Sequence, residues 1–332
     1  MQKVLSVSVA AYNVQDYIRQ CLDSFLGEGI TERVEVLVTD DGSGDSTPEI
    51  VAEYAEKYPG SFVLIRQENA GPGSTVNSGI RHATGKYFRM VDGDDWVNTA
   101  DMSAYLDFLE SHDADMVLTH YCRVDHVSGR REPARLEAPV WDEVIPFEDV
   151  CGDLDLAMHN ITYRTALLQE NGFRVDNSFY TDAEYVAFPV PWVKSAAFLD
   201  RTIYMYRVAL AGQSMNIQSL QRNVAVHRNV LNHLTEAYAR CEAAGGAGPN
   251  TLAFLRRFIA ARAGMQLTIH LTFPDRKEYA RETRRMMEDI RAASPALYET
   301  VCRARSFRLL DRTRGRLFPL LAAWQSRKLT GE

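Results

Sequence analysis

Strand-like and helix-like segments alternate through the first 125 residues of this 332-residue chain. Residues 4–11 form a nearly continuous apolar run, which is typical of a strand buried on both faces. The other expected elements are strands at residues 34–38, 62–65 and 86–91 and helices at residues 14–26, 46–58 and 74–83. Strands that alternate with helices imply right-handed crossovers. The sequence therefore predicts an α/β fold with a mostly parallel central sheet covered by helices on both faces.

The helix at residues 46–58 also carries a start signal. Ser46 and Glu49 have the spacing of a capping box. In that motif the serine side chain accepts a hydrogen bond from the first turn of the helix. We therefore expect Ser46 to cap this helix.

The pattern changes along the rest of the chain. Strand and short-helix signals mix between residues 116 and 207, and the pattern is helical beyond residue 214, with a break at the glycine-rich residues 245–249. We therefore expect two domains, an α/β domain over residues 1–212 and a C-terminal helical appendage over residues 213–332.

The composition is that of an ordinary globular protein. The five cysteines are widely spaced and include no C-x-x-C pair, so neither a zinc site nor a disulfide framework is indicated. No signal-peptide pattern opens the chain. No run of about 18 apolar residues offers a membrane-spanning helix. We expect a location in the reducing cytoplasm.

The net charge of −7 conceals an asymmetry. Between residues 303 and 328, eight basic residues face one acid, Asp311, so this segment carries +7 and the rest of the chain −14. An acidic body argues against nucleic acid as the main partner. Two interpretations of the basic segment stay open. It could lie as an amphipathic helix on an anionic membrane, or pack on the body through its apolar face.

Polar and glycine-rich stretches follow the four expected strands at residues 10–13, 39–45, 69–74 and 92–95. Ligands of parallel sheets bind at the carboxyl ends of the strands, so these stretches should meet at one edge. The last stretch contains Asp92, Asp94 and Asp95, which repel one another in the absence of a cation. A hard divalent cation that bridges to phosphate oxygens would account for them. Gly93 lets the backbone turn sharply and lets a ligand approach.

Taken together, these stretches resemble the glycosyltransferases of family 2, which have the GT-A fold. The resemblance covers roughly residues 3–210, in the family's order and spacing. The segments that carry it are Val7-Ser8-Val9-Ala10-Ala11-Tyr12-Asn13, Asp40-Asp41-Gly42-Ser43-Gly44-Asp45, Asn69-Ala70-Gly71, Gly85-Lys86-Tyr87-Phe88, Asp92-Gly93-Asp94-Asp95, Tyr180-Thr181-Asp182-Ala183-Glu184 and Tyr204-Met205-Tyr206-Arg207. A D-x-D triplet alone is a weak signal, whereas the ordered set is specific. The chain has Thr75-Val76-Asn77 where relatives usually have Ala-Arg-Asn.

The resemblance implies a nucleotide-sugar site in residues 1–125. Ala10 and Tyr12 would line the nucleoside pocket, with the tyrosine ring packed against the base. Asp41 would accept a hydrogen bond from the base, most simply from the N3–H of uracil. The donor implied is therefore a UDP-sugar.

The resemblance also places the rest of the donor. Asp92 and Gly93 would lie by the ribose and the sugar-phosphate. Asp94, the last residue of the D-x-D triplet, would bind Mn²⁺ or Mg²⁺ between the diphosphate oxygens. Gly71, in the Asn-x-Gly turn, matches a donor-binding position, and Arg207 would help to hold the diphosphate.

Residues 126–212 are implied to form the acceptor and catalytic part, with Asp182 as the general base. Inverting transfer needs a carboxylate to take the proton of the acceptor hydroxyl, and positive charge on the leaving diphosphate. Asp182 opens a helical stretch whose amino terminus would keep it ionised. Glu184 would point elsewhere and is ranked below it. The implied function is inverting sugar transfer to a glycan or lipid-linked acceptor, in cell-surface polysaccharide synthesis.

Each motif also has a plainer interpretation. The aspartates after the second and fourth strands could cap solvated turns, and Asp182 could be a helix cap. His120 and His159 are expected to be packing or surface residues rather than ligands. The main functional alternative is a catalytically inactive nucleotide-sugar-binding module, but the presence of both Asp94 and Asp182 argues against it. A sugar-phosphate nucleotidyltransferase would need a glycine-rich loop with a basic residue after the first strand, which this chain lacks.

Overall fold

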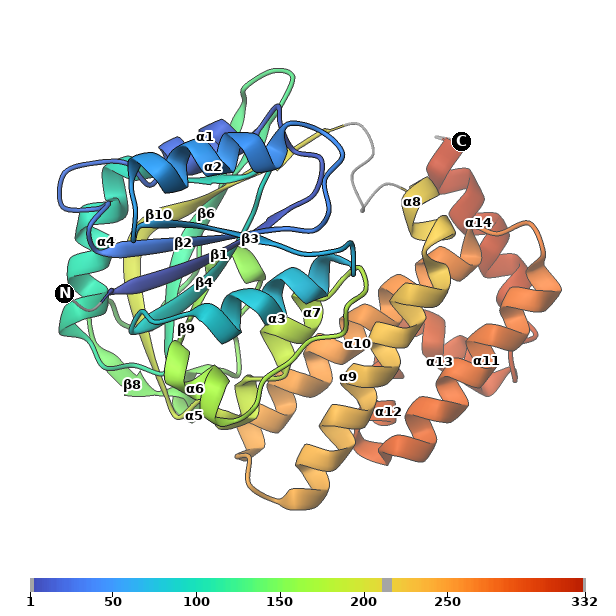
Figure 1. The fold of residues 1–332 in the computed structure, drawn as a ribbon. Helices are drawn as coiled ribbons and strands as arrows, with labels where there is room; N and C mark the ends of the chain where they lie inside the picture. The colour runs from blue at the N-terminus through green and yellow to red at the C-terminus, as the bar shows by residue number, and fades with distance from the viewer. Residues whose placement is uncertain (1–2, 211–216, 331–332) are drawn as a thin grey trace. The chain divides into compact units, whose positions relative to one another are not determined.

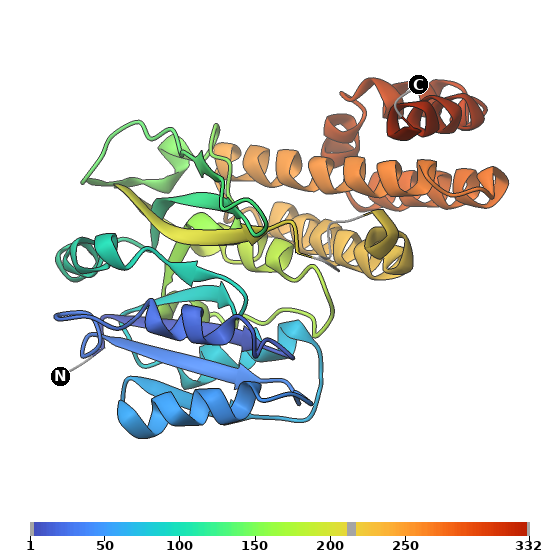
Figure 2. The same ribbon diagram turned by 90° about the horizontal axis from the view of Figure 1, so that it is seen from above.

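The computed structural model describes residues 3–210 and 217–330, and Figures 1 and 2 show it from two sides. The chain divides into two compact units, Met1–Ala211 and Gly212–Glu332, each of which is described by itself. The domain boundary expected near residue 212 lies outside the described residues, as do the first and last residues of the expected appendage.

The first unit is built around one mixed sheet. Its strands are β1 (Leu5–Ala11), β2 (Val34–Asp40), β3 (Phe62–Arg66), β4 (Tyr87–Asp92), β5 (Trp96–Val97), β6 (Met116–Asp125), β7 (Arg131–Ala134), β8 (Val144–Pro146), β9 (Ile161–Arg164) and β10 (Ser195–Val208). The order of the main path is β3-β2-β1-β4-β9-β6-β10-β5, with β7 paired to β6 and β8 paired to β10. The α/β class expected from the sequence is confirmed.

The strand directions bring six carboxyl ends to one rim of the sheet. β1 pairs in parallel with β2 and β4, and β2 pairs in parallel with β3. β9 is antiparallel to both β4 and β6, so β6 has the direction of β4, and β10 is parallel to β6. The ends of β1, β2, β3, β4, β6 and β10 therefore share a rim. Every residue of β2 is buried, as in a strand covered on both faces.

Helices cover both faces of this sheet. They are α1 (Ile18–Asp23), α2 (Thr47–Lys57), α3 (Pro72–His82), α4 (Thr99–Ser111), α5 (Phe147–Val150), α6 (Thr165–Glu170) and α7 (Asp182–Ala187). Figure 1 shows α1 and α2 on one face and α3 and α6 on the other. The helices expected at residues 14–26, 46–58 and 74–83 are present, although α1 has only six residues and α3 begins two residues early, at Pro72.

The start of α2 differs from the predicted capping box. Ser46 is the N-cap residue, but its side chain makes no capping hydrogen bond. The Asp45 carboxylate instead accepts the Thr47 N–H at 2.9 Å and the Gln15 N–H at 3.1 Å. Ser46 has φ −79° and ψ 12°, outside the β region from which an N-cap side chain reaches the first turn. The prediction was wrong because Asp45 ties the helix to the loop after β1.

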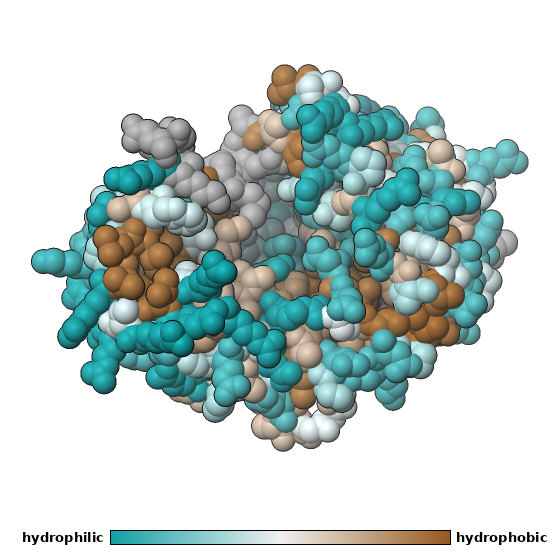
Figure 3. Space-filling view, turned by 180° about the vertical axis from the view of Figure 1, so that it is seen from behind, coloured by the Kyte–Doolittle hydropathy of each residue, from teal (hydrophilic) through white to brown (hydrophobic). Residues whose placement is uncertain are grey.

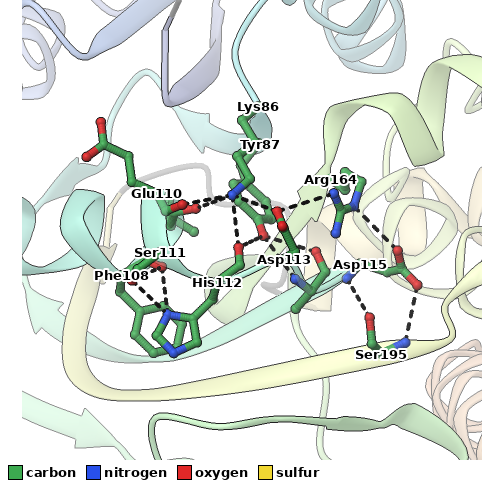
Figure 4. Close-up of polar contacts among 12 residues, drawn as sticks. Lys86, Tyr87, Phe108, Glu110, Ser111, His112, Asp113, Asp115, Arg164 and Ser195 are labelled. Atoms are coloured by element: carbon green, nitrogen blue, oxygen red, sulfur yellow. Dashed lines mark hydrogen bonds and ion pairs between the residues drawn. The ribbon is translucent and has the colours of Figure 1, made fainter.

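A polar cluster fastens the opposite rim, where β4, β6 and β10 begin (Figure 4). The Lys86 ammonium donates to three main-chain carbonyls at and just beyond the end of α4, at 3.0 to 3.1 Å. A cation is favourable at a helix carboxyl terminus. Lys86 also pairs with Asp113 at 2.9 Å, and Arg164 contacts both Asp113 and Asp115. These contacts hold the starts of the strands together, away from the rim at which the loops meet.

The second unit contains only helices among its described residues. They are α8 (Ile217–Arg222), α9 (Val224–Ala244), α10 (Pro249–Leu271), α11 (Arg276–Ala293), α12 (Pro295–Val301), α13 (Arg305–Arg312) and α14 (Phe318–Thr330). α10 packs against α9, α11, α12 and α14. On α10 the buried Gln266 side chain lies 2.6 Å from Nδ1 of His227 and 2.8 Å from Nε2 of His270. None of the described helices has the length and apolar character needed to cross a membrane.

The basic segment forms α13 and α14. Phe307 and Leu310 on α13 and Phe318 on α14 are buried within the second unit. Leu320 and Trp324 on α14 are 67% and 62% exposed. Figure 3 shows that apolar residues on one face of the molecule gather in patches bordered by hydrophilic side chains. Each helix of the basic segment therefore packs through one side and presents apolar and basic residues on another.

Candidate functional site

The loops after β1, β2 and β4 are joined by main-chain hydrogen bonds at the carboxyl rim. Ala10 lies beside Asp92 in the register of β1 and β4. The Gly93 N–H donates to the Ala10 carbonyl at 2.9 Å, and the Asp41 N–H donates to the Ala11 carbonyl at 2.9 Å. The structure therefore brings the polar stretches of these three strands together.

The loop after β1 presents an aromatic ring to solvent. Tyr12 is 52% exposed. The next residue, Asn13, has φ 53°, a left-handed conformation that asparagine tolerates better than most residues. The Asn13 N–H donates to Ser43 Oγ at 3.0 Å, and its side-chain oxygen accepts the Gly44 N–H at 2.8 Å. The loop after β1 is thus held in place by the loop after β2. The Tyr12 ring that it carries is exposed and can stack against a ligand.

Asp41 is buried and shapes the loop after β3. Its Oδ1 accepts the Ala70 N–H at 2.9 Å and the Gln67 side-chain amide at 2.6 Å. Its Oδ2 accepts the Gly71 N–H at 2.9 Å. Gly71 has φ 91°, which favours glycine. Asp41 therefore organises the loop that contains Gly71, and Gln67 is a site residue that no local sequence pattern marked.

The loop after β4 gathers three carboxylates. Ligand oxygens of Asp92, Asp94 and Asp95 lie within 4.8 Å of one another. Burial, with the charges of Asp94 and Asp182, raises the pKa of Asp92 to about 7. Burial also raises the pKa of Asp94, and burial with the two neighbouring charges raises the pKa of Asp95 well above its usual range. The three negative charges disfavour one another, and a cation would relieve them.

Two residues of β10 hold Asp95 in place with hydrogen bonds. Its Oδ2 accepts the Tyr204 hydroxyl at 2.6 Å, and its Oδ1 accepts the Arg207 N–H at 2.7 Å. Asp95 is 1% exposed. Both of its oxygens are thus bonded within the protein, so Asp95 supports the loop. Asp92 and Asp94 are only partly buried and remain for a ligand.

Asp92 and Asp94 fit a divalent cation. Carboxylate oxygens are the ligands that Mg²⁺ and Mn²⁺ prefer. Magnesium bound with a phosphate substrate usually takes one or two protein carboxylates and keeps water on its other positions. The pair offered here, on a loop supported by Asp95, matches that donor set.

Asp182 is the first residue of α7 and is exposed. Its charge helps to raise the pKa of Asp92, so it lies close to the acidic loop. Burial and the surrounding aspartates, Asp182 among them, raise the pKa of Tyr206 to about 12. Glu184 is fully buried and accepts the Asp176 N–H at 2.6 Å. The two carboxylates of this helix therefore have different surroundings, with Asp182 exposed near the acidic loop and Glu184 buried.

Arg207 lies behind the acidic loop. Its Nε donates to the Asp94 carbonyl at 2.7 Å, and another guanidinium nitrogen donates to Gln20 at 2.7 Å. The guanidinium carbon lies 4.7 Å from the ring centre of Trp96 and 5.0 Å from that of Tyr17. These contacts favour a role in positioning the loop over the direct contact with diphosphate expected from the sequence.

His159 and His120 make packing contacts. The His159 ring stacks on Tyr206 and Tyr121, with centroids 4.4 and 5.1 Å apart, and burial lowers its pKa to about 3. Nε2 of His120 lies 3.0 Å from the Asp200 carboxylate. Both histidines therefore have structural partners within the first unit.

Comparison with known families agrees with this geometry. Residues 6–172 match the model of the family described as "Glycosyl transferase family 2". The match includes the loops after β1, β2, β3 and β4. The chain belongs to glycosyl transferase family 2.

Curated relatives are similar over part of their length. An uncharacterized protein of Mycobacterium tuberculosis (strain H37Rv) is 34% identical over 130 residues, which are 39% of this chain and 38% of the relative. The uncharacterized glycosyltransferase EpsJ of Bacillus subtilis is 28% identical over 217 residues, 62% of each chain. The poly(ribitol-phosphate) beta-glucosyltransferase of Bacillus spizizenii is 28% identical over 177 residues, 50% of this chain and 26% of the relative. The chain thus spans less than two thirds of each relative's length.

The fold is shared with a solved structure. Residues 1–349 of TarS from S. aureus, crystallised in complex with UDP-GlcNAc, match 99% of this chain and 92% of that chain with a TM-score of 0.63. The identity is 20%, so this likeness concerns the fold alone.

Proposed function

We propose that this protein transfers a sugar from a nucleotide-diphosphate donor, a UDP-sugar, to an acceptor hydroxyl, with inversion at the anomeric carbon. One observation carries the proposal. The charge of Asp182 acts on Asp92, in the acidic loop, and helps to raise the pKa of Asp92. The proposed base therefore lies near Asp92, one of the two carboxylates proposed to hold a cation.

The donor would lie across the loops after β1, β3 and β4. The exposed Tyr12 ring offers a stacking surface for uracil. Oδ2 of Asp41 accepts one hydrogen bond among the described contacts, which leaves it an acceptor position for the base N3–H. Ala10, Gly71, Asp92 and Gly93 line the path toward the diphosphate in this proposal. The fold shared with TarS, which was crystallised with UDP-GlcNAc, supports placing a uridine nucleotide there.

Asp94, with Asp92 beside it, would hold Mn²⁺ or Mg²⁺. The cation, when bound, offsets the negative charge that develops on the leaving diphosphate. Asp95 and Arg207 keep the loop in shape from behind. Without this support the two carboxylates would move apart, because their charges repel.

Asp182 would act as the general base. Its carboxylate accepts the proton of the acceptor hydroxyl while the acceptor oxygen forms a bond to the anomeric carbon. The bond from that carbon to the diphosphate oxygen breaks on the opposite face, and its electron pair leaves with the diphosphate. Attack opposite the leaving group inverts the configuration. The exposure of Asp182 leaves it open to an acceptor.

The experiment is a nucleotide-release assay with a panel of UDP-sugars, with and without Mn²⁺, followed by NMR of the anomeric proton in the product. We expect metal-dependent release of UDP and an inverted product. Asp182→Asn should lower turnover by about 10²- to 10⁴-fold, the usual contribution of a general base. Glu56→Gln, which alters an exposed carboxylate on α2, is the matched control and should leave turnover unchanged.

The same assay separates the alternative function. A chain that binds UDP in a calorimetric titration, yet releases none from any donor and is indifferent to Asp182→Asn, is a nucleotide-sugar-binding module. Retained configuration in the product would contradict the assignment of Asp182 as a base for direct attack.

The acceptor and the location belong to the same proposal. EpsJ and the poly(ribitol-phosphate) enzyme are named as glycosyltransferases. The name of the second enzyme includes the polymer poly(ribitol-phosphate). We extend the proposal to a glycan or lipid-linked acceptor of cell-surface polysaccharide synthesis, reached from the cytoplasmic side. A peripheral contact with the membrane through residues 303–328 would bring the enzyme to such an acceptor.

α14 supports this contact. Leu320, Trp324 and Arg327 are spaced by four and three residues, which places them on one side of the helix, away from the buried Phe318 and Ala322. Apolar side chains with a tryptophan and flanking arginines suit an anionic lipid surface. The rest of the chain is acidic, so this segment would meet such a surface first.

Vesicle sedimentation tests the contact. Vesicles with phosphatidylglycerol should bind the full chain, and vesicles of phosphatidylcholine alone should bind it less. Leu320→Ser combined with Trp324→Ser should weaken binding, whereas Val127→Ser, which alters an apolar residue of the first unit that is 84% exposed, should not. If the double variant and Val127→Ser bind the vesicles equally well, the basic segment packs on the protein and makes no membrane contact.

A further inference from the structure

The residues that precede Asp182 lie along α3, the helix that begins in the loop after β3. We call residues 69–74 the donor loop and residues 173–182 the base segment. Just before the base segment, the Gln169 side-chain amide donates to two carbonyls at the end of α3, at 2.9 and 3.0 Å. The chain then runs back along α3 toward the donor loop.

Asn77, in the middle of α3, holds the base segment with paired hydrogen bonds. Its Nδ2 donates to the Val175 carbonyl at 2.9 Å, and its Oδ1 accepts the Val175 N–H at 3.0 Å. The two residues are 98 positions apart in the chain. A second bond from Nδ2 reaches Oδ1 of Asn177 at 3.3 Å. One amide side chain therefore satisfies both main-chain groups of Val175, as a neighbouring strand would.

At the start of α3 the two backbones touch directly. A Cβ atom on Gly71 would lie 1.8 Å from the Asn177 carbonyl oxygen. A Cβ atom on Gly73 would lie 1.7 Å from the Asp176 carbonyl oxygen. Only glycine allows main chains to approach this closely. The donor loop and the base segment are thus packed together without intervening side chains.

The base segment also carries strain that its neighbours must hold. Tyr180, two residues before Asp182, has φ 65°, which is costly for a residue with a Cβ atom. The segment is anchored on its other side by Glu184, which accepts the Asp176 N–H at 2.6 Å. Its conformation therefore depends on contacts from α3 and α7 together.

We propose that Asn77 is a positioning residue, which holds the base segment against the donor loop and so sets where Asp182 stands relative to a bound donor. The inference rests on the proposed function for the role of Asp182. Two consequences follow. A nucleotide in the donor loop steadies the base segment, and loss of the Asn77 bonds separates catalysis from donor binding.

Asn77→Ala tests whether catalysis can be impaired without a loss of donor binding. A misplacement of about 1 Å can cost on the order of 10²-fold in rate, so we expect a loss of that size in kcat. We expect the Kd for UDP to change by less than about twofold, because Asp41 still binds the Ala70 and Gly71 amides. The matched control is Asn171→Ala, which removes only a local bond to the Leu167 carbonyl, and should change neither value.

Amide hydrogen exchange gives a second readout. In the wild type, UDP should slow exchange in residues 173–182, and in Asn77→Ala this slowing should be lost. Asn77→Asp keeps the acceptor for the Val175 N–H but loses the donor to the Val175 carbonyl. The slowing of exchange by UDP in this variant should therefore be intermediate between that in the wild type and that in Asn77→Ala. Asn77→Asp also replaces Asn77→Ala in the test if the alanine variant does not fold.

The outcomes are distinct. Equal losses of kcat and of UDP affinity in Asn77→Ala would indicate general loosening and overturn the proposal, as would an unchanged kcat. If the wild type transfers no sugar from any donor, the proposed function fails. The exchange experiment with UDP then tests only whether a nucleotide in the donor loop steadies the base segment. Unchanged exchange in residues 173–182 on addition of UDP would overturn that coupling.

Discussion

The Tyr204 hydroxyl donates a 2.6 Å hydrogen bond to Asp95 and accepts the Asp92 N–H at 3.2 Å. One side chain from β10 thereby holds two positions of the acidic loop after β4. Tyr204 and Asp95 are almost completely buried. Burial and the charges of Asp95 and Asp92 raise the pKa of Tyr204 well above its usual range, so its hydroxyl stays protonated and able to donate.

Tyr204→Phe should destabilise the protein and disturb the loop. The change leaves an Asp95 oxygen and the Asp92 N–H buried without this partner, which should lower the free energy of unfolding by about 1–3 kcal/mol. Urea denaturation followed by circular dichroism measures the loss. Tyr58→Phe, which removes a hydroxyl without a described hydrogen bond, is the control. Equal stability of the two variants would mean that the Asp95 contact contributes little.

The parallel part of the sheet was predictable because its signals are local. The apolar run of β1 and the spacing of α2 and α3 lie within a few residues of one another. The placement of β9 between β4 and β6 was not predictable. β9 has four residues, and its antiparallel pairing depends on partners about 45 and 75 positions away in the chain. No pattern within so short a strand specifies them.

The same distinction applies to the site. Asp92 and Asp94 stood out because three carboxylates within four residues repel one another, and Asp182 because its segment matches that of the family. Asn77 and Gln67 were missed because an amide on a helix or loop is ordinary until its partner is known. The supporting role of Asp95 likewise depends on β10, more than 100 positions away. The residues proposed to meet a ligand were thus easier to pick out from the sequence than the residues that hold them in place.

The second unit should lose stability in mild acid through His270. Its Nε2 lies 2.8 Å from the Gln266 amide nitrogen, and its Nδ1 lies 2.8 Å from Thr283 Oγ1. Burial, with the charges of Arg228 and His227, lowers the pKa of His270 to about 4. Protonation at Nε2 would place one N–H against another.

The pKa of His270 differs between the folded and unfolded states, and this difference sets the direction in which stability changes with pH. An unfolded histidine takes up its proton near pH 6.5, whereas the folded His270 takes it up near pH 4. As the pH falls between these values, the unfolded state binds more protons, so stability declines, by up to about 3 kcal/mol. Urea denaturation at pH 7 and pH 5 should show this decline in the wild type and a smaller one in His270→Gln. The same decline in both would assign it to other groups.

Gly93→Ala should weaken donor binding. A Cβ atom at this position would lie 2.7 Å from the Ala10 carbonyl oxygen and 3.1 Å from Val14 Cγ2. The neighbouring main chain would have to shift, which moves the loop that carries Asp92. We expect a rise of about tenfold in the KM for the donor, measured in the nucleotide-release assay. Gly152→Ala, where a Cβ meets nothing within 4 Å, should leave KM unchanged.

Asp94→Asn should distinguish the charge repulsion within the acidic cluster from the binding of a cation to it. Without a cation, the charge of Asp94 acts unfavourably on Asp92 and Asp95, as the raised pKa values of both show. Removing that charge should therefore raise the melting temperature of the metal-free protein. In the wild type, Mn²⁺ should raise the melting temperature, because a ligand selective for the native state stabilises it by mass action. In Asp94→Asn this response should be much reduced, since one of two available ligands has lost its charge. A variant that is less stable without metal, yet responds fully to Mn²⁺, would mean that Asp94 serves the fold and that the cation binds elsewhere.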